Sequence, residues 1–167
     1  MAPAKPVSLT TFMRKVPVFG GLEGRSLARV LGVLEEHTFK SGATIFGEGE
    51  LGRSMYVLRE GEVEVLRANS AGKNVPIVRL GPGECFGEMT LVELQPRSAT
   101  IVARRACKVY SMNNMDLYNL YRDDNYAYVL VLQNISRMLS RRLRKADSRI
   151  CEFLSPPAKP ARRARSR

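Results

Sequence analysis

The chain has 167 residues and a formal net charge of +11, and its length suits one compact domain with a full core and flexible ends. No apolar run approaches the roughly 18 residues of a membrane-spanning helix, and residues 1–15 lack the apolar block of a secretory signal, so we expect a cytoplasmic protein. Three cysteines without Cys-x-x-Cys spacing and a single histidine, His37, argue against a metal site and against a metal-dependent enzyme.

Two helices are expected before the first strands. Residues 8–15 form a short helical stretch after Pro6, and residues 23–35 form the second helix. One apolar face of the second helix is formed by Leu27, Val30, Leu31 and Leu34. We assign residues 1–15 to an N-terminal arm, because the domain pattern begins only after them.

Short apolar segments separated by glycine and polar turns dominate residues 37–112. The strands expected there cover residues 44–46, 55–58, 63–66, 75–80, 99–103 and 108–112. Val63 and Val65 alternate with Glu62 and Glu64, which directs one face inward and the other to water. The pattern predicts an α+β fold, a β jelly-roll barrel of about eight strands with N-terminal helices and a long C-terminal helix.

The most informative segment, residues 81–100, places one acid and one base around a glycine-rich bend. Gly87 lets the backbone approach a ligand, and the residues after it can open a short helix whose N–H groups face an anion. Arg97 offers a forked cation for phosphate, whereas Glu88 suits a sugar hydroxyl because two anions repel. The pair therefore suits a cyclic nucleotide. Alternatively, Glu88 and Arg97 pair with each other across a surface loop, which is worth only about 0–1 kcal/mol.

Phe86-Gly87-Glu88, a short apolar turn and then Pro-Arg-Ser-Ala-Thr at residues 96–100 resemble the phosphate-binding cassette of the cyclic-nucleotide-binding domain family. The strand-glycine-strand pattern of residues 45–65 is also similar, although Arg53 stands where the family more often has an acid. The resemblance implies that Glu88 binds the ribose 2′-hydroxyl and Arg97 the cyclic phosphate. The full implied ligand set is Phe86, Gly87, Glu88, Met89, Arg97 and Ser98. We assign the domain to residues 16–151.

A short helix over residues 114–121 and a long one over residues 124–151 are predicted next, with Asp123, Asp124 and Asn125 as candidate N-caps. A heptad seam along the long helix consists of Val129, Leu132, Ser136, Leu139, Leu143, Ala146 and Ile150. This seam predicts a parallel homodimer. A neighbouring stripe could instead lie on the barrel, and it consists of Tyr128, Leu132, Ile135 and Met138. The alternative to a dimer is an amphipathic helix that folds back on its own domain.

The long helix is similar to that of the catabolite activator protein branch of the family, where it carries the dimer interface and reaches the nucleotide base. The resemblance implies an apolar lid from Leu139 or Leu143. The base-contacting pair of that branch aligns approximately with Ala146 and Asp147, which lack the hydroxyl groups expected there. Ser98 in place of a threonine favours cyclic AMP over cyclic GMP by the same resemblance.

The positive charge is concentrated at the C-terminal end. Residues 137–167 contain 11 basic and 2 acidic side chains, whereas residues 1–136 contain 16 and 14. Such an arm suits an acidic partner or nucleic acid. The alternative is a solvated helix face followed by a solubilising, disordered tail over residues 152–167.

Only 16 residues follow Cys151, too few for a winged helix-turn-helix. Because no kinase, channel or cyclase segment accompanies the domain, we expect a stand-alone sensor with no catalytic residues and no cofactor. Its long helix would relay ligand binding to a partner. The alternative is a degenerate scaffold that dimerises, does not bind nucleotide and carries a basic, nucleic-acid-binding arm.

Overall fold

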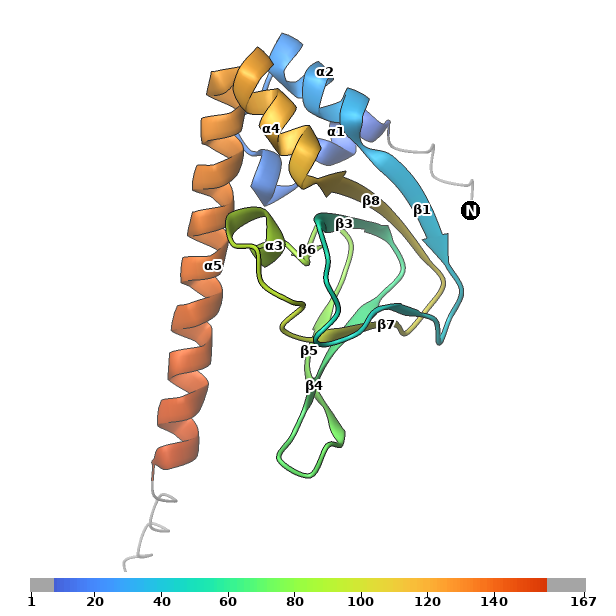
Figure 1. Ribbon diagram of the computed structural model, residues 1–167, viewed down its shortest axis with the longest axis vertical. Coiled ribbons are helices and arrows are strands. Elements are labelled where there is room, and N and C mark those ends of the chain that lie inside the picture. The colour runs from blue at the N-terminus through green and yellow to red at the C-terminus, as the bar shows by residue number, and fades with distance from the viewer. Residues whose placement is uncertain (1–7, 156–167) are drawn as a thin grey trace, which may run out of the picture.

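The computed structural model describes residues 8–155, and eight strands form two four-stranded antiparallel sheets at its centre (Figure 1). The first sheet has the order β1-β8-β3-β6 and the second β2-β7-β4-β5. The strands are β1 (Glu35–Phe39), β2 (Thr44–Phe46), β3 (Ser54–Glu60), β4 (Val63–Ala68), β5 (Asn74–Leu80), β6 (Cys85–Phe86), β7 (Thr100–Ala103) and β8 (Cys107–Asn113). The predicted α+β jelly roll of about eight strands is therefore confirmed.

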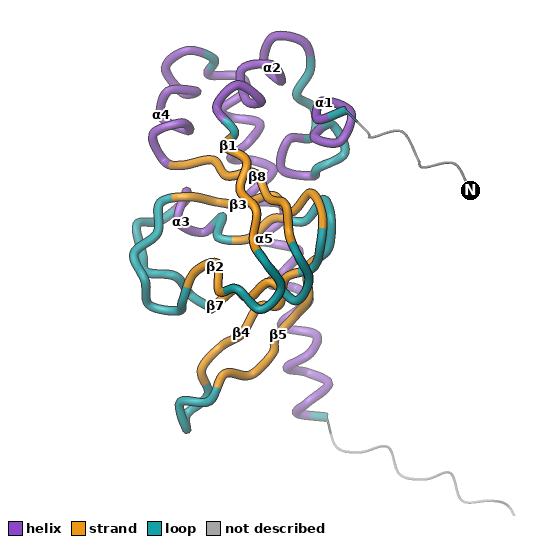
Figure 2. Tube along the Cα trace, turned by 90° about the vertical axis from the view of Figure 1, so that its right-hand side faces the viewer, coloured by secondary structure: helices purple, strands orange, loops and turns teal. Residues whose placement is uncertain are grey.

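Helices cover one end and one side of these sheets. They are α1 (Leu9–Met13), the 3₁₀ turn η1 (Pro17–Phe19), α2 (Gly24–Val33), α3 (Met89–Val92), α4 (Asn114–Asp123) and α5 (Asn125–Leu154). Figure 2 shows α1, α2 and α4 gathered at one end of the sheets, with the β4–β5 hairpin projecting from the other end. None of the helices within residues 8–155 is long and apolar enough to cross a membrane.

Two strands were not predicted. They are β1 and β6. The helix expected over residues 23–35 was predicted too long and included the start of β1: Leu34 has an extended ψ of 128°, and Glu35 already pairs with Ser111 of β8. Strand β1 carries little apolar pattern of its own, and β6 has only two residues, so both form through pairing with a neighbouring strand. Their own sequences give no alternation that would indicate a strand.

The core has two parts. One lies between the sheets and contains Phe46, Leu58, Val63, Leu80, Phe86, Ile101, Ala103, Cys107 and Val109. The other lies between the helices and the first sheet, and α5 contributes Ala127, Val131, Ile135 and Met138 to it. In the predicted barrel-facing stripe, Ile135 and Met138 are buried, whereas Tyr128 and Leu132 are half-buried at its edge.

Helix α5 is fixed to the domain mainly through its first half. Asp124 is the N-cap: its Oδ1 accepts from the Ala127 N–H at 3.1 Å, and its Oδ2 accepts from Ser26 Oγ at 2.8 Å. The hydrogen bond from Ser26 lowers the pKa of the Asp124 carboxyl. Further along, the buried Asn134 donates to the carbonyls of Val18 and Gly20 at 3.2 and 2.8 Å.

The second half of α5 is more exposed, and no residue after Met138 in this helix is fully buried. The helix ends at Leu154 rather than at the predicted residue 151. Most of the predicted basic tail and the first seven residues of the predicted arm lie outside the described residues. The three domain boundaries stay predictions.

Candidate functional site

The candidate cassette begins where β6 turns into α3. Gly87 has a φ of +70°, which side-chain-bearing residues rarely adopt. A Cβ at this position would lie 2.6 Å from Arg97 Nη1 and 3.1 Å from the Ser54 carbonyl oxygen. The hydroxyl of Thr90 donates to the Gly87 carbonyl at 3.0 Å and so holds the first turn of α3. Glycine therefore allows the sharp turn and the close approach of the guanidinium.

Arg97 lies inside this turn and is 6% exposed. Its Nη2 donates to the Ser54 carbonyl at 2.8 Å, its Nη1 donates to the Gly87 carbonyl at 3.1 Å, and its Cζ lies 3.9 Å from the centre of the Phe46 ring. Within residues 8–155, no carboxylate oxygen lies within 4.0 Å of this guanidinium. Burial lowers the pKa of Arg97 from its ordinary value.

The Nε of Arg97 is buried and has no hydrogen-bond partner. The loop between β2 and β3 packs against this side of the guanidinium, and a Cβ on Gly52 would lie only 2.2 Å from Nε. The same loop is tied to the cassette backbone, because Gly49 N–H donates to Arg97 O and Arg97 N–H donates to Glu50 O, both at 2.8 Å. The site thus holds a fixed cation with an unused N–H donor.

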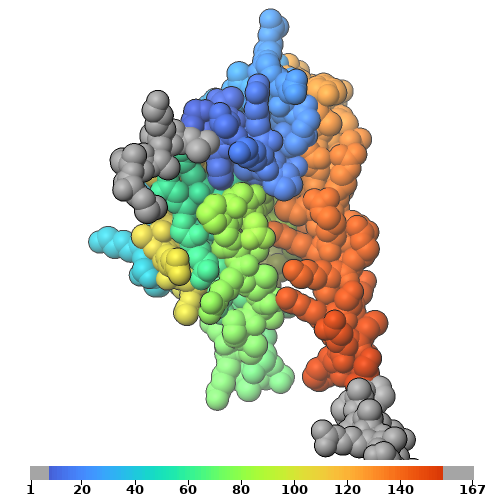
Figure 3. All heavy atoms as spheres, turned by 180° about the vertical axis from the view of Figure 1, so that it is seen from behind, coloured from blue at the N-terminus to red at the C-terminus, as the bar shows by residue number. Residues whose placement is uncertain are grey.

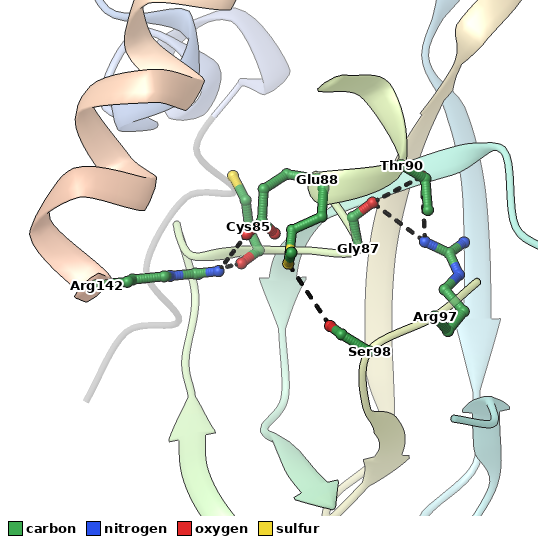
Figure 4. Close-up of polar contacts among 8 residues, drawn as sticks. Cys85, Gly87, Glu88, Thr90, Arg97, Ser98 and Arg142 are labelled. Carbon is green, nitrogen blue, oxygen red and sulfur yellow. Dashed lines mark hydrogen bonds and ion pairs between the residues drawn. The ribbon is translucent and has the colours of Figure 1, made fainter. Parts of the chain in front are cut away.

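Glu88 is the second buried charge of the cassette, at 3% exposed. Its Oε1 accepts a hydrogen bond from Arg142 Nη1 at 2.7 Å, and Arg142 Nη2 also donates to the Cys85 carbonyl (Figure 4). The pairing of Glu88 with Arg97 that the sequence left open does not form. Instead, Arg142 reaches Glu88 from α5, while Arg97 lies on the other side of the bend beside Gly87 and Thr90.

The remaining predicted residues lie around these two charges. Phe86 is buried and stacks on Tyr56 with ring centres 5.3 Å apart. Met89 is 39% exposed, and the exposed Ser98 donates to its sulfur at 3.6 Å. The structure therefore brings all six predicted cassette residues into one small region.

The candidate lid residues differ in their surroundings. Leu139 is half-buried and packs against the core between the helices and the first sheet. Leu143, one turn later, is 63% exposed. The aligned base-contacting positions, Ala146 and Asp147, are also exposed. Of the two candidate lid residues, Leu143 is therefore the one whose side chain does not already pack in the core.

Three residues of the site were missed from the sequence: Arg142, Phe46 and Gly52. Arg142 belongs to a run of basic residues, and only its position one turn after the buried Met138 indicates that it faces the barrel. Phe46 reads as an ordinary strand residue, and Gly52 as an ordinary turn glycine. Both residues pack against the Arg97 guanidinium, and the local sequence around them does not predict where that guanidinium lies.

The family model for the Cyclic nucleotide-binding domain matches residues 36–124. The chain is 34% identical over 139 residues to the Cyclic AMP receptor protein of Thermus thermophilus, a match that covers 81% of this chain and 61% of that protein. The chain therefore spans about three fifths of the length of this relative.

Two solved structures resemble the chain closely. The crystal structure of the Thermus thermophilus Catabolite Activator Protein has a TM-score of 0.73 at 32% identity, covering 82% of this chain and 62% of that one. A cyclic nucleotide-binding domain from Methylobacillus flagellatus has a TM-score of 0.79 at 20% identity, covering 90% and 88%. At that identity, the second likeness shows the fold alone.

Proposed function

The chain belongs to the cyclic nucleotide-binding domain family, and from this premise we propose that it is a sensor that binds cyclic AMP in preference to cyclic GMP. One observation carries the proposal: Arg97 is a buried guanidinium with no carboxylate partner among the described residues. A buried charge without a counter-ion is costly, and a phosphate monoanion would supply one. The name of the Thermus thermophilus relative, a cyclic AMP receptor protein, supports the adenine nucleotide.

The proposed binding mode uses the donors that the protein leaves free. The Nε–H of Arg97 has no acceptor, and Nη2 carries a second N–H beyond the one bound to Ser54. These neighbouring groups can form a fork for two oxygens of a cyclic phosphate. Because Gly52 now packs against this edge of the guanidinium, we expect the loop between β2 and β3 to move away when the phosphate binds. Glu88 uses Oε1 for Arg142, which leaves Oε2 to accept a hydrogen bond from the ribose 2′-hydroxyl.

The proposed output is a shift in how α4 and α5 pack against the barrel. Arg142 connects α5 directly to Glu88, so a ligand that changes the position of Glu88 also changes the position of α5. The ligand can bias this equilibrium only by its difference in affinity for the two arrangements. We include a homodimer through α5 in the proposal, because Val129, Leu143 and Ile150 are 41%, 63% and 56% exposed in the single chain.

Isothermal titration with cyclic AMP and cyclic GMP tests this function. In Arg97→Ala, which loses the charged donors, we expect binding to weaken by about ten- to a hundredfold. Arg97→Lys keeps the charge but not the fork, and should lie between that variant and the parent. Arg105→Ala is the matched control, since Arg105 is an exposed barrel arginine that should not affect binding.

Circular dichroism of each variant separates lost binding from lost folding. Equal affinity in the parent and the folded Arg97→Ala variant would show that the cassette assignment is wrong. No heat with either nucleotide in the parent would favour the alternative, a dimeric scaffold with a basic arm. Binding of that arm to duplex DNA would fall steeply with salt concentration.

A further inference from the structure

A basic cleft lies beside the cassette, between α5, η1 and the turn that joins β5 to β6. Its volume is about 240 Å³, and the buried Met138 and Cys85 contribute to its wall. Arg141, Arg142 and Lys145 line it from α5. None of the six residues predicted to bind the nucleotide lines this cleft. In Figure 3, side chains of α5 extend toward the barrel across this region.

The cations of the cleft share one face of α5. Lys145 follows Arg141 by four residues and Arg142 by three, so the three cations lie together within about one helical turn. Arg142 is already held in place by Glu88 and the Cys85 carbonyl. Arg141 and Lys145 are exposed, and within the described part of the chain neither has a carboxylate oxygen within 4.0 Å.

One acid also lines the cleft, and it does not balance these charges. Glu84 lies in the turn between β5 and β6, and its Oε2 accepts the Gly81 N–H at 2.7 Å. Because Arg142 is already paired with Glu88, Arg141 and Lys145 remain opposite Glu84, which leaves a surplus of one positive charge around a recess with apolar wall residues. A recess of this kind attracts an anion, and several cations at once favour an anion with several charges.

We propose that this cleft is a second anion-binding site, which takes a short polyphosphate chain. Arg141 and Lys145 are its adjustable donors, and Arg142 is its fixed one. A volume of about 240 Å³ admits a few phosphate groups but not a nucleic-acid duplex, so the shape favours a small molecule over a macromolecular polyanion. Arg97 and Ser98 are not part of this cleft, although Arg142 connects it to Glu88 of the cassette.

Calorimetric titration of the full chain with sodium tripolyphosphate tests the proposal. We expect about tenfold or greater loss of affinity in the Arg141→Gln/Lys145→Gln double variant. The matched control, Arg144→Gln/Arg149→Gln, removes two charges from the same helix, but neither residue lines the cleft. It should change the affinity by less than about threefold, since only screened, long-range attraction is lost. Equal losses in the two double variants would overturn the proposal and indicate diffuse attraction to a basic helix, as for nucleic acid.

Two further titrations separate the cleft from the cassette and identify the source of the phosphates. Arg97→Ala should retain tripolyphosphate binding, and loss of binding there would place the anion in the cassette and overturn the proposal. ATP is the second probe: equal affinity for ATP and tripolyphosphate would show that the phosphate chain alone is recognised. Binding of ATP without binding of tripolyphosphate would contradict the proposed chemistry. Both titrations are carried out without cyclic AMP, so that failure of nucleotide binding and failure of this proposal are read separately.

Discussion

Arg97 keeps its charge inside the barrel with the help of uncharged groups. Two carbonyl oxygens accept its N–H groups, and the ring of Phe46 lies against its guanidinium, where a cation–π contact is favourable. Burial lowers its pKa, but an arginine starts so far above neutrality that it stays charged. The position of the guanidinium therefore depends on backbone and ring packing, and small changes there should alter ligand affinity.

Gly52→Ala should weaken cyclic AMP binding without unfolding the protein. The added Cβ would lie 2.2 Å from Nε and 2.4 Å from Cζ of Arg97, so the guanidinium must move. Gly52 does not have a positive φ, so alanine can adopt its backbone conformation. We expect at least about tenfold weaker binding by calorimetry, as for loss of a charged hydrogen bond, and a melting temperature near that of the parent.

Gly32→Ala is the control for this substitution. No heavy atom lies within 4 Å of the added Cβ at this position, which is in α2. Alanine in a helix is about 0.5–1 kcal/mol more favourable than glycine, so this variant should be slightly more stable and bind normally. Parent-like affinity in Gly52→Ala would show that the observed position of Arg97 is not needed for binding.

The three cysteines should differ in reactivity. Burial, and then the charge of Glu88, raises the pKa of Cys85 to about 12, and burial also raises the pKa of Cys107. Cys151 is exposed on α5. Because the thiolate is the reactive form, Ellman's reagent at about pH 8 should label one thiol per native chain rapidly. Cys151→Ser should remove this fast phase, and any rapidly labelled thiol in that variant would contradict the burial of Cys85 and Cys107.

At the scale of elements, the two halves of α5 make different contacts with the rest of the domain. Its first half contributes Val131 and Ile135 to the core and is tied by Asn134 to two carbonyls. Its second half touches the cassette through Arg142, which binds Glu88. Among residues 8–155, this charged contact directly connects the candidate ligand site to the exposed part of the helix.

A double-mutant cycle with Glu88→Gln and Arg142→Gln should give a coupling of about 1–3 kcal/mol in the free energy of unfolding. The carboxylate is almost fully buried, so solvent screens the pair weakly. The exposed pair of Arg67 and Glu48 is the comparison, and its coupling should be below about 1 kcal/mol. Both can be measured by urea unfolding. Similar couplings in the two pairs would argue against a structural link through Arg142.

The sequence predicted those features that depend on residues close together in the chain. The cap at Asp124, the buried side of α5 around Ile135 and Met138, and the cassette each depend on neighbouring residues. The partner of Glu88 lies 54 residues further along the chain, so its identity depends on how α5 docks. Strand β1 was missed for the same reason, since its hydrogen bonds come from β8, more than 60 residues away.

At the scale of the described molecule, the second half of α5 exposes several large apolar side chains. Leu143, Ile150, Phe153 and Leu154 are 63%, 56%, 88% and 73% exposed. Two of these belong to the predicted heptad seam, and the other two extend the apolar surface beyond it. The first half of α5 does fold back on its own domain, as one alternative expected, but that packing leaves the second half uncovered. Exposed apolar side chains that gather along one helix are typical of an interface.

Leu143→Glu/Ile150→Glu should convert the proposed dimer into a monomer in sedimentation velocity experiments. The substitutions remove apolar side chains from the seam and place like charges of the two helices close together, which opposes association. Leu51→Glu/Leu94→Glu is the control, because these leucines are 89% and 83% exposed on loops outside α5. If the seam is the interface, the control stays dimeric while the α5 variant is a monomer. A dimer in both variants would place the interface elsewhere, and a monomeric parent would leave Arg142 to transmit the signal within one chain.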